Sequence, residues 1–145
     1  MTTIAFDGKT MACDTRVAGD HIYNTDTKIY ENDFAVIGVA GDAVSGVMLI
    51  DCQGILRPQP YDFDFEALVF VKDTGKVYKV AFYKSWDCAL SSVVPVADGY
   101  AAVGSGSPYA LAAMYLGHTA ARAITVAAQF DTNTGGKIIT KQLLG

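Results

Sequence analysis

Histidine and cysteine are scarce in this sequence, and their scarcity limits the chemistry that the chain can support. Histidine occurs only at His21 and His118, so a catalytic triad with a histidine base has few candidates. The three cysteines are widely spaced, and none belongs to a C-x-x-C motif. An odd number of isolated cysteines suits a reducing compartment and argues against a zinc site. We expect neither a metal nor a cofactor.

Long apolar runs and clusters of basic residues are also missing. No stretch approaches the roughly 18 consecutive apolar residues of a membrane span, and no signal peptide is apparent. The 11 Lys and Arg residues are scattered over a chain of net charge -4, which argues against nucleic-acid binding. We therefore predict a cytoplasmic protein without a membrane or nucleic-acid partner.

Apolar residues, by contrast, are abundant. They make up 51% of the 145 residues, while charged residues make up 18%, so a packed core is expected and disorder is not. A chain of this length buries about two-thirds of its unfolded surface when it folds. We predict a single domain over residues 1–145.

Short extended segments dominate the first half of the sequence. TTIAF and KTMAC are joined by Asp7-Gly8, a dipeptide typical of a tight hairpin turn. KIYE and FAVIGVAG are further expected strands, and the near-continuous apolar character of the second favours a strand covered on both faces. Apolar residues spaced by three and four predict a helix over residues 42–51, ahead of Gly54.

A hairpin, a helix pair and a last strand are expected in the second half. ALVFVKDTGKVYKVAFY predicts two strands around a turn at residues 73–75. GYAAVG predicts a short strand, and two alanine-rich helices follow it; we expect Ser107 to cap the first, with Pro108 after it, and Gly117 to end it. KIITKQLL predicts the last strand. Two sheets between layers of helices account for this order.

The residues after Met1 offer a nucleophile that needs no histidine. The α-amine of a chain, with an unperturbed pKa of about 7.7–8.0, can act as the base for a hydroxyl on the same residue. Methionine before a small residue is normally trimmed, so we predict that Met1 is removed and that Thr2 carries both groups. The alternative is that Thr2 is merely the exposed start of a first strand.

Several segments together resemble the catalytic β-subunits of the proteasome and the bacterial HslV peptidase. TTIAFDGKTMACDTR is followed by KIY at Lys28 and by VIGVAGDA. VGSGSPYALAAM resembles the family's glycine-serine-glycine turn and Tyr-Ala helix, and FDTNTGG resembles its Asp-x-x-Ser/Thr-Gly segment. These pieces follow the family's order over nearly the whole chain. The resemblance implies an N-terminal nucleophile (Ntn) hydrolase with the α+β, four-layer αββα sandwich, acting as a threonine-type endopeptidase.

The resemblance also implies roles for individual residues. Seven would form the catalytic site: Thr2, Asp14, Lys28, Gly41, Ser105, Asp131 and Thr134. The first would be the nucleophile, with Asp14 and Lys28 as charged partners that lower the cost of forming an alkoxide. The Gly41 N–H would stabilise the oxyanion, and the last three would hydrogen-bond around the terminal amine and the nucleophile.

Substrates and partners follow from the same resemblance. Four residues would line the pocket beside the nucleophile and select an apolar side chain before the cut: Val17, Tyr30, Val39 and Ala43. The substrate would be a peptide or an unfolded protein, and the subunits would form homo-oligomeric rings, with an ATPase unfoldase as a further partner. The chain departs from the family between residues 42 and 67, where one helix and the PQPYDFDF loop replace two longer helices.

Other interpretations of the same residues stay open. Asp14 could be a turn or cap residue, Lys28 could be a solvated charge at a strand edge, and the Asp131 segment could simply shape a turn. GSGS before a helix could bind phosphate, although it lacks the lysine of a P-loop. For the whole chain, the alternatives are a non-catalytic structural subunit of a proteasome-like assembly and a small-molecule Ntn amidase.

Overall fold

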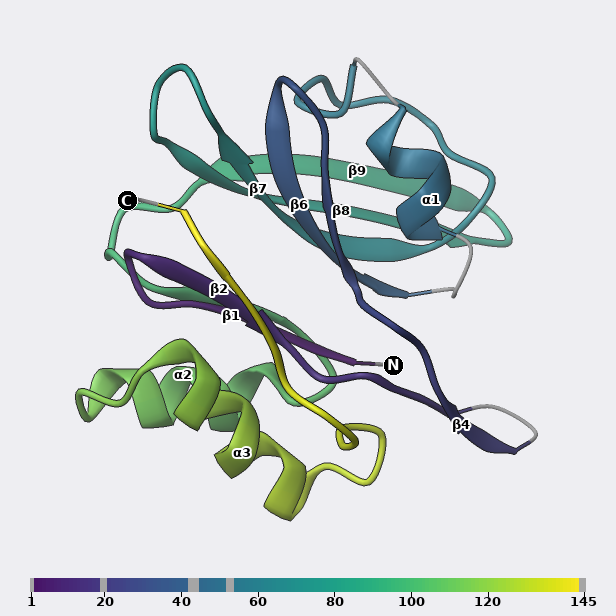
Figure 1. Cartoon of the computed structure of the whole chain (residues 1–145). Helices are drawn as coiled ribbons and strands as arrows, with labels where there is room; N and C mark the ends of the chain where they lie inside the picture. Colours follow the sequence, from purple (N-terminus) through teal and green to yellow (C-terminus); the bar gives the residue numbers. More distant parts are fainter. Residues whose placement is uncertain (1, 19–20, 42–44, 52–53, 144–145) are drawn as a thin grey trace.

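Two β-sheets lie face to face at the centre of the molecule, with helices on their outer sides (Figure 1). The structure is a computed structural model that describes residues 2–18, 21–41, 45–51 and 54–143. Met1, Ala43 and the first residues of the helix predicted over 42–51 lie outside the described residues. The fold is mixed α/β, and strands dominate it.

The first sheet has four antiparallel strands in the order β10-β1-β2-β11. They are β10 (Ala101–Gly104), β1 (Thr3–Phe6), β2 (Thr10–Cys13) and β11 (Ile139–Gln142). The predicted hairpin between β1 and β2 is confirmed, and the Asp7 carboxylate accepts the N–H groups of Lys9 and Thr10 in its turn, at 3.0 and 2.9 Å. Its other oxygen accepts the N–H of Ala120 at 2.9 Å, which ties the turn to a helix.

Helices α2 (Ser107–Tyr115) and α3 (Ala120–Phe130) cover the outer face of this sheet (Figure 1). The contact consists largely of alanines, which allow helices and strands to lie close together. Gly117 follows the end of α2, as predicted, and its N–H donates to the carbonyl of Met114 at 2.9 Å. The prediction that Ser107 caps α2 is wrong, because the cap position falls on Gly106 and Ser107 is the first helical residue.

The second sheet has five antiparallel strands in the order β5-β6-β7-β8-β9. They are β5 (Ile29–Glu31), β6 (Ala35–Gly41), β7 (Phe65–Val71), β8 (Val77–Ser85) and β9 (Cys88–Pro95). Strand β6 is covered on both faces, as its apolar sequence predicted: Val36 and Ala40 face the other sheet, while Ile37 and Val39 face outward. Helix α1 (Ser45–Ile50) packs on that outward face.

The core between the two sheets is continuous and fully apolar at its centre. Ile4 and Met11 from the first sheet meet Leu68 and Phe70 from the second, and each is at least 95% buried. Burial of this kind is the main source of stability for a two-sheet arrangement. It also fixes the N-terminal strand β1 between β2 and β10, next to the second sheet.

Three strands were not expected from the sequence. Strands β3 (Arg16–Ala18) and β4 (Ile22–Asn24) form a hairpin that projects from the body of the molecule (Figure 1). Strand β9 forms the largely exposed edge of the second sheet. None of the three has the alternation of buried and exposed residues that reveals a half-buried strand in a sequence.

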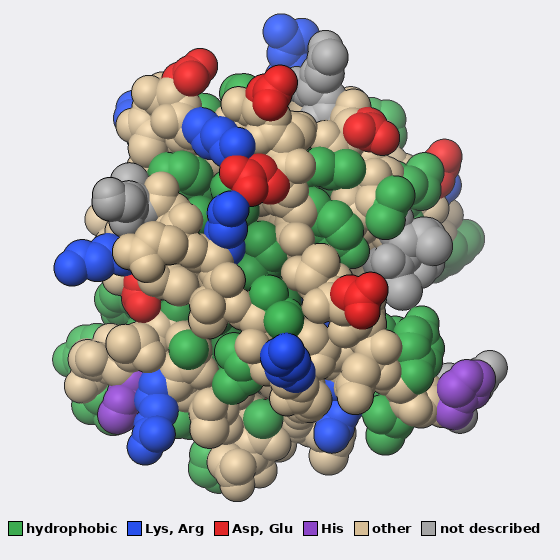
Figure 2. Space-filling view, in the orientation of Figure 1, with side chains coloured by type: hydrophobic (Ala, Val, Ile, Leu, Met, Phe, Trp, Pro, Cys, Tyr) green, Lys and Arg blue, Asp and Glu red, His purple; other side chains and the backbone are tan. Residues whose placement is uncertain are grey.

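The helical layer outside the second sheet holds only the six-residue helix α1 among the described residues. The predicted four-layer αββα sandwich therefore stays a prediction, while its mixed α/β character is confirmed. Within the described part of the chain, no helix has the length and apolarity to cross a bilayer. Acidic and basic side chains are interspersed on the face shown in Figure 2 and do not gather by sign.

Candidate active site

Three polar side chains from separate segments meet at the start of β1. The Thr2 hydroxyl donates a hydrogen bond to Oδ1 of Asp14 and accepts one from Nζ of Lys28. The Lys28 Nζ lies 2.9 Å from the same carboxylate oxygen. All three residues are buried, at 3%, 0% and 7% exposure respectively. The structure thus brings together the three residues that the sequence placed at the centre of the site.

The Asp14 carboxylate is fully satisfied despite its burial. Besides the hydroxyl and the ammonium, it accepts the N–H of Thr3 at 3.1 Å and the N–H of Gly135 at 3.0 Å. A buried charge is tolerated only when it is paired and hydrogen-bonded in this way. Asp14 follows β2 directly, so its position is set by the β1–β2 hairpin.

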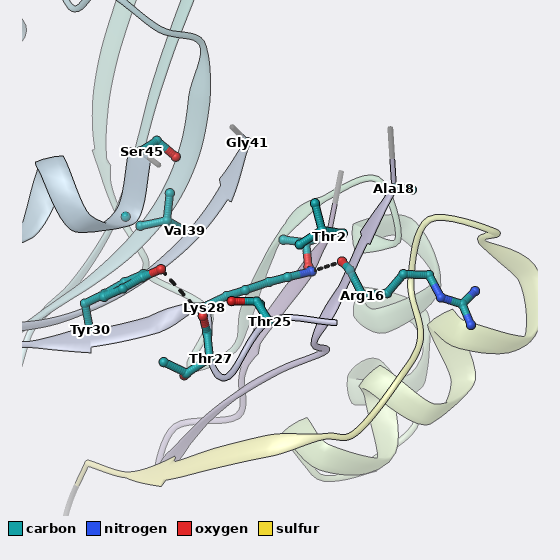
Figure 3. A pocket seen from close by; sticks show the side chains of 12 residues that line it. Thr2, Arg16, Ala18, Thr25, Thr27, Lys28, Tyr30, Val39, Gly41 and Ser45 are labelled. Carbon is teal, nitrogen blue, oxygen red and sulfur yellow. Dashed lines mark hydrogen bonds between the residues drawn. The ribbon is translucent and has the colours of Figure 1, made fainter. Parts of the chain in front are cut away.

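The Lys28 ammonium is held by three acceptors on one side. They are the Asp14 carboxylate, the Thr2 hydroxyl and the carbonyl oxygen of Arg16; Figure 3 shows Lys28 with Thr2 and Arg16. Burial lowers the pKa of Lys28 below its usual value, and the attraction of Asp14 offsets this effect only in part. The ammonium therefore depends on its partners and is not a solvated charge at a strand edge.

A second polar cluster lies beside the first. Oδ2 of Asp131 accepts hydrogen bonds from the hydroxyls of Ser105 and Thr134, each at 2.6 Å. Burial raises the pKa of Asp131, but these two hydrogen bonds and others outweigh it, so the pKa lies below its usual value. The Thr134 hydroxyl is also 2.7 Å from the hydroxyl of Thr3. This hydrogen bond connects the cluster to Thr3, the neighbour of the expected nucleophile.

A pocket of about 50 Å³ opens beside Thr2 (Figure 3). Its lining comes from the residue before β1, from the segment between β4 and β5, and from β3, β5, β6 and α1. The residues are Thr2, Arg16, Val17, Ala18, Thr25, Thr27, Lys28, Tyr30, Val39, Gly41, Ser45 and Gly46. Three of the four residues expected to select the substrate are among them, and the fourth, Ala43, lies outside the described residues. The pocket has a polar mouth at Thr2 and Lys28 and apolar walls at Val39 and Tyr30.

Gly41 lies at the end of β6, on the wall of the pocket. Its φ of 154° is a conformation that side chains rarely adopt, and an added Cβ would lie 2.8 Å from the carbonyl oxygen of Asp64. The backbone here therefore requires glycine. The role of the Gly41 N–H as the oxyanion donor stays a prediction.

Some residues of this site were not singled out from the sequence. Thr3, Arg16 and Gly135 contribute backbone groups to the Asp14 and Lys28 contacts. Backbone donors and acceptors have no signature in residue type, so only the folded chain reveals them. Thr25, Thr27 and Ser45 add hydroxyl-bearing side chains to the pocket, but isolated Ser and Thr residues are too common to be informative.

Metal binding can be examined over the described ranges alone. Within residues 2–18, 21–41, 45–51 and 54–143, no group of three or more His, Cys, Asp or Glu side chains could hold a metal ion. The two carboxylates of the site, Asp14 and Asp131, direct their oxygens at N–H, ammonium and hydroxyl donors.

Comparison with solved structures gives a likeness in fold. No protein-family model matches the chain, and no curated protein matches it. The structure of Thiobacillus denitrificans BPH in complex with epoxomicin is similar, with a TM-score of 0.72, 21% sequence identity and 100% of both chains covered. At this identity the likeness concerns the fold alone, and the compared region spans the full length of both chains.

Proposed function

We propose that this chain is a threonine-type endopeptidase, an Ntn hydrolase of the proteasome type, with Thr2 as its nucleophile. The observation that carries the proposal is the hydrogen-bonded series from Lys28 through the Thr2 hydroxyl to Asp14, at the mouth of a pocket. The likeness to BPH, which was solved with epoxomicin, supports it. The proposed architecture is an αββα sandwich with a reduced outer helical layer.

The chemistry begins with activation of the hydroxyl. The Lys28 ammonium donates to the Thr2 oxygen and so stabilises negative charge on it, while Asp14 holds the ammonium in place. The α-amine of Thr2 accepts the hydroxyl proton as the oxygen attacks the carbonyl carbon of the scissile bond. The resulting oxyanion accepts the N–H of Gly41, a type of contact that contributes about 3–4 kcal/mol in acyl-transfer enzymes.

The same amine completes the reaction. As an ammonium it returns its proton to the leaving amine, and the acyl group stays on Thr2 as an ester. A water molecule then attacks this ester while the amine accepts its proton. The amine passes that proton to the departing Thr2 oxygen, so the carboxylic acid product leaves and the hydroxyl and the free amine are restored. Ser105, Asp131 and Thr134 form the hydrogen-bonded cluster beside this site, and we assign them to holding the nucleophile's backbone, through Thr3, and its amine.

The mechanism requires a free amine on Thr2. In the sequence Thr2 follows Met1, so its nitrogen belongs to a peptide bond and cannot act as a base until that bond is cut. We expect the active form to have lost Met1. The intact mass of the purified active protein measures this directly, and full retention of Met1 in an active preparation contradicts the amine mechanism.

The substrate is proposed to be a peptide or an unfolded protein with an apolar residue before the cut. Val39 is 95% buried in the pocket wall, and the ring of Tyr30 packs beside it against α1. An apolar side chain entering between them would lose its contact with water. Val17 also lines this pocket, and Ala43 is assigned to the same pocket from the sequence.

The proposed active form is a ring-shaped homo-oligomer. Large apolar side chains are exposed on the helix pair α2 and α3: Tyr115 at 76%, Leu116 at 75% and Phe130 at 66%. Exposed apolar side chains of this size are suited to contact with another subunit. The ATPase unfoldase and the cytoplasmic location stay predictions. Light scattering over a range of concentrations tests the assembly, and a strictly monomeric profile contradicts it.

Substitution of Thr2 is the central test. Thr2→Ala removes the hydroxyl but permits methionine removal, so turnover of fluorogenic peptides with an apolar residue before the cut should be lost. Thr2→Ser keeps the hydroxyl and should retain measurable turnover. Thr125→Ala, a hydroxyl removal at an exposed position of α3, is the matched control and should equal the wild type. Thr3 is a poor control, because its hydroxyl is buried against Thr134.

The same experiment separates the alternative functions. Epoxomicin, an epoxyketone, reacts with a hydroxyl and a free amine together, so its adduct should appear by mass spectrometry in the wild type and not in Thr2→Ala. Undiminished turnover in Thr2→Ala ends the threonine-peptidase proposal. A folded wild type with neither turnover nor adduct favours a non-catalytic subunit. An adduct without peptide turnover favours a small-molecule amidase.

A further inference from the structure

Glu66 occupies an unusual position for a charged residue. On β7 it lies on the same face as Leu68 and Phe70, which belong to the apolar core between the two sheets. It is one of only two glutamates in the chain, and it is half-buried. A carboxylate at an inward-facing position is tolerated only when its oxygens are hydrogen-bonded.

Both oxygens of Glu66 have partners, on opposite sides. Oε2 crosses to the other sheet and accepts the N–H of Gly104 at 2.8 Å. Oε1 accepts the phenol hydroxyl of Tyr83 on the neighbouring strand β8. Burial, followed by the hydrogen bond to Glu66, raises the pKa of Tyr83, so the phenol keeps the proton that it donates. Tyr83 thereby holds the carboxylate in the orientation that reaches Gly104.

Gly104 lies directly against the backbone of Thr2. It ends β10, where it pairs with Thr3, and it has a φ of 98°. A Cβ added to it would lie 1.8 Å from the carbonyl oxygen of Thr2 and 3.2 Å from the Cβ of Ala40. The N-terminal residue is therefore in close contact with the group that Glu66 binds.

Glu66 also lies beside the strand that ends at the expected oxyanion donor, Gly41. In the β6–β7 ladder it pairs with Ala40, the residue before Gly41. One side chain thus connects β7, the ladder partner of the strand that ends at the expected oxyanion donor, with β10, the strand beside the expected nucleophile. Thr2 and Gly41 belong to different sheets, and the apolar core between these sheets is non-directional, whereas a hydrogen bond has a preferred length and angle.

We propose that Glu66 is a positioning residue, which sets the placement of Thr2 relative to Gly41 by binding the N–H of Gly104. The inference rests on the proposed function for its catalytic consequence. Attack on a carbonyl and stabilisation of its oxyanion require both groups at fixed positions, and displacement by about 1 Å can lower the rate by roughly a hundredfold. Glu66 touches neither the substrate nor the reacting atoms in this account.

Two substitutions of Glu66 test the proposal. Glu66→Ala removes the bond to Gly104 and should lower kcat by about tenfold to a hundredfold, with KM changed by less than about threefold. Glu66→Gln keeps a carbonyl oxygen that can accept the N–H of Gly104, so it should restore most of the lost kcat. Glu31→Ala, at the only other glutamate, is the matched control and should leave kcat unchanged.

A second measurement does not depend on turnover. The γ-methyl group of Thr2 gives an NMR signal in selectively methyl-labelled protein, and it is assigned by its disappearance in Thr2→Ser. Glu66→Ala should shift this signal, Glu66→Gln should shift it much less, and Glu31→Ala should not move it. A wild type without turnover contradicts the proposed function, while the methyl signal still decides whether Glu66 positions Thr2.

Three results overturn the inference. An unmoved Thr2 signal in Glu66→Ala shows that the bond to Gly104 does not place the nucleophile. Equal losses of kcat in Glu66→Ala and Glu66→Gln show that the charge acts, and not the hydrogen bond. If Glu66→Ala does not fold, Glu66→Asp takes its place, because the aspartate side chain is shorter and cannot reach Gly104 from β7. A wild-type kcat together with an unmoved Thr2 signal in Glu66→Asp also overturns the inference.

Discussion

Two groups of ion-paired side chains in this molecule have similar distances between their charged atoms but very different exposure to solvent. Lys28 and Asp14 lie 2.9 Å apart, with side-chain exposures of 9% and 0%. Glu31 lies 2.7 Å from both Lys72 and Lys141, and these three side chains are exposed by 32% to 42%. Distance alone ranks the two groups as equals, but their environments make them different kinds of interaction.

The buried pair belongs to the site, whereas the exposed group belongs to the scaffold. Removing charges from water costs more than a buried pair regains unless further hydrogen bonds are made, and Asp14 makes several. Glu31 connects β5 with Lys141 on β11, so it joins the edges of the two sheets. Solvent and salt weaken such an exposed contact. We therefore expect the buried Lys28–Asp14 pair, and not the exposed Glu31 group, to be essential for stability and activity.

Removal of Asp14 should have the largest effect on stability. Asp14→Ala leaves the Lys28 ammonium without its countercharge and leaves the N–H groups of Thr3 and Gly135 without an acceptor. We expect the free energy of unfolding to fall by about 3–5 kcal/mol, measured by urea denaturation at matched protein concentration. Asp73→Ala, in the exposed β7–β8 turn, is the control. Equal urea midpoints for the two variants contradict the importance of the buried pair.

Removal of Lys28 should affect activity more than stability. Lys28→Met leaves the Asp14 carboxylate with the donors Thr2, Thr3 and Gly135, so the chain should fold, but kcat should fall by at least about a hundredfold.

Lys28→Arg should not restore the lost rate. Three acceptors converge on the single Nζ atom of Lys28, and the planar fork of a guanidinium distributes its donors over several nitrogens. Peptide turnover, with circular dichroism to confirm folding, measures both variants. A rate near that of the wild type in Lys28→Met places Lys28 outside the chemistry, and recovery in Lys28→Arg shows that charge alone is sufficient.

The sequence predicted the buried parts of this fold better than the exposed parts. Strands β6 and β7 were recognised from their apolar residues. A strand that is buried on one face or on both needs apolar side chains at regular spacing, and this spacing is visible in the sequence. Strand β9 has mostly exposed side chains, so its residue types are not constrained in this way. Ser107 was expected to cap α2 from its residue type, but the chain already turns at Gly106.

The parts of the site that consist of side chains in recognisable sequence motifs were predictable. Thr2, Asp14 and Lys28 were named from segments that resemble a known family, and the fold brings them together. Glu66 was not named, because its role depends on a backbone N–H in another sheet. Contacts of that kind appear only after the strands have been paired and the sheets packed.

The exposed group at Glu31 should give the smallest effect, and it should depend on solution conditions. Glu31→Gln removes the charge that Lys72 and Lys141 share, so we expect a slightly lower Tm at low salt. The difference should vanish near 1 M salt, where the screening length is about 3 Å. The rate of peptide turnover should be unchanged, because Glu31 does not line the pocket beside Thr2.

The pH dependence of the same variant sharpens the comparison. Hydrogen bonds from Lys141 and Lys72 lower the pKa of Glu31 from 4.5 to about 2. A lowered carboxyl pKa stabilises the folded chain above the ordinary pKa, and this contribution is lost as the pH falls from 4.5 through about 2. The Tm values of the wild type and Glu31→Gln should therefore converge on acidification. A Tm difference that persists in about 1 M salt would show that the Glu31 group is as protected from solvent as the Lys28–Asp14 pair. A Tm difference that grows below pH 4.5 would contradict the lowered pKa of Glu31.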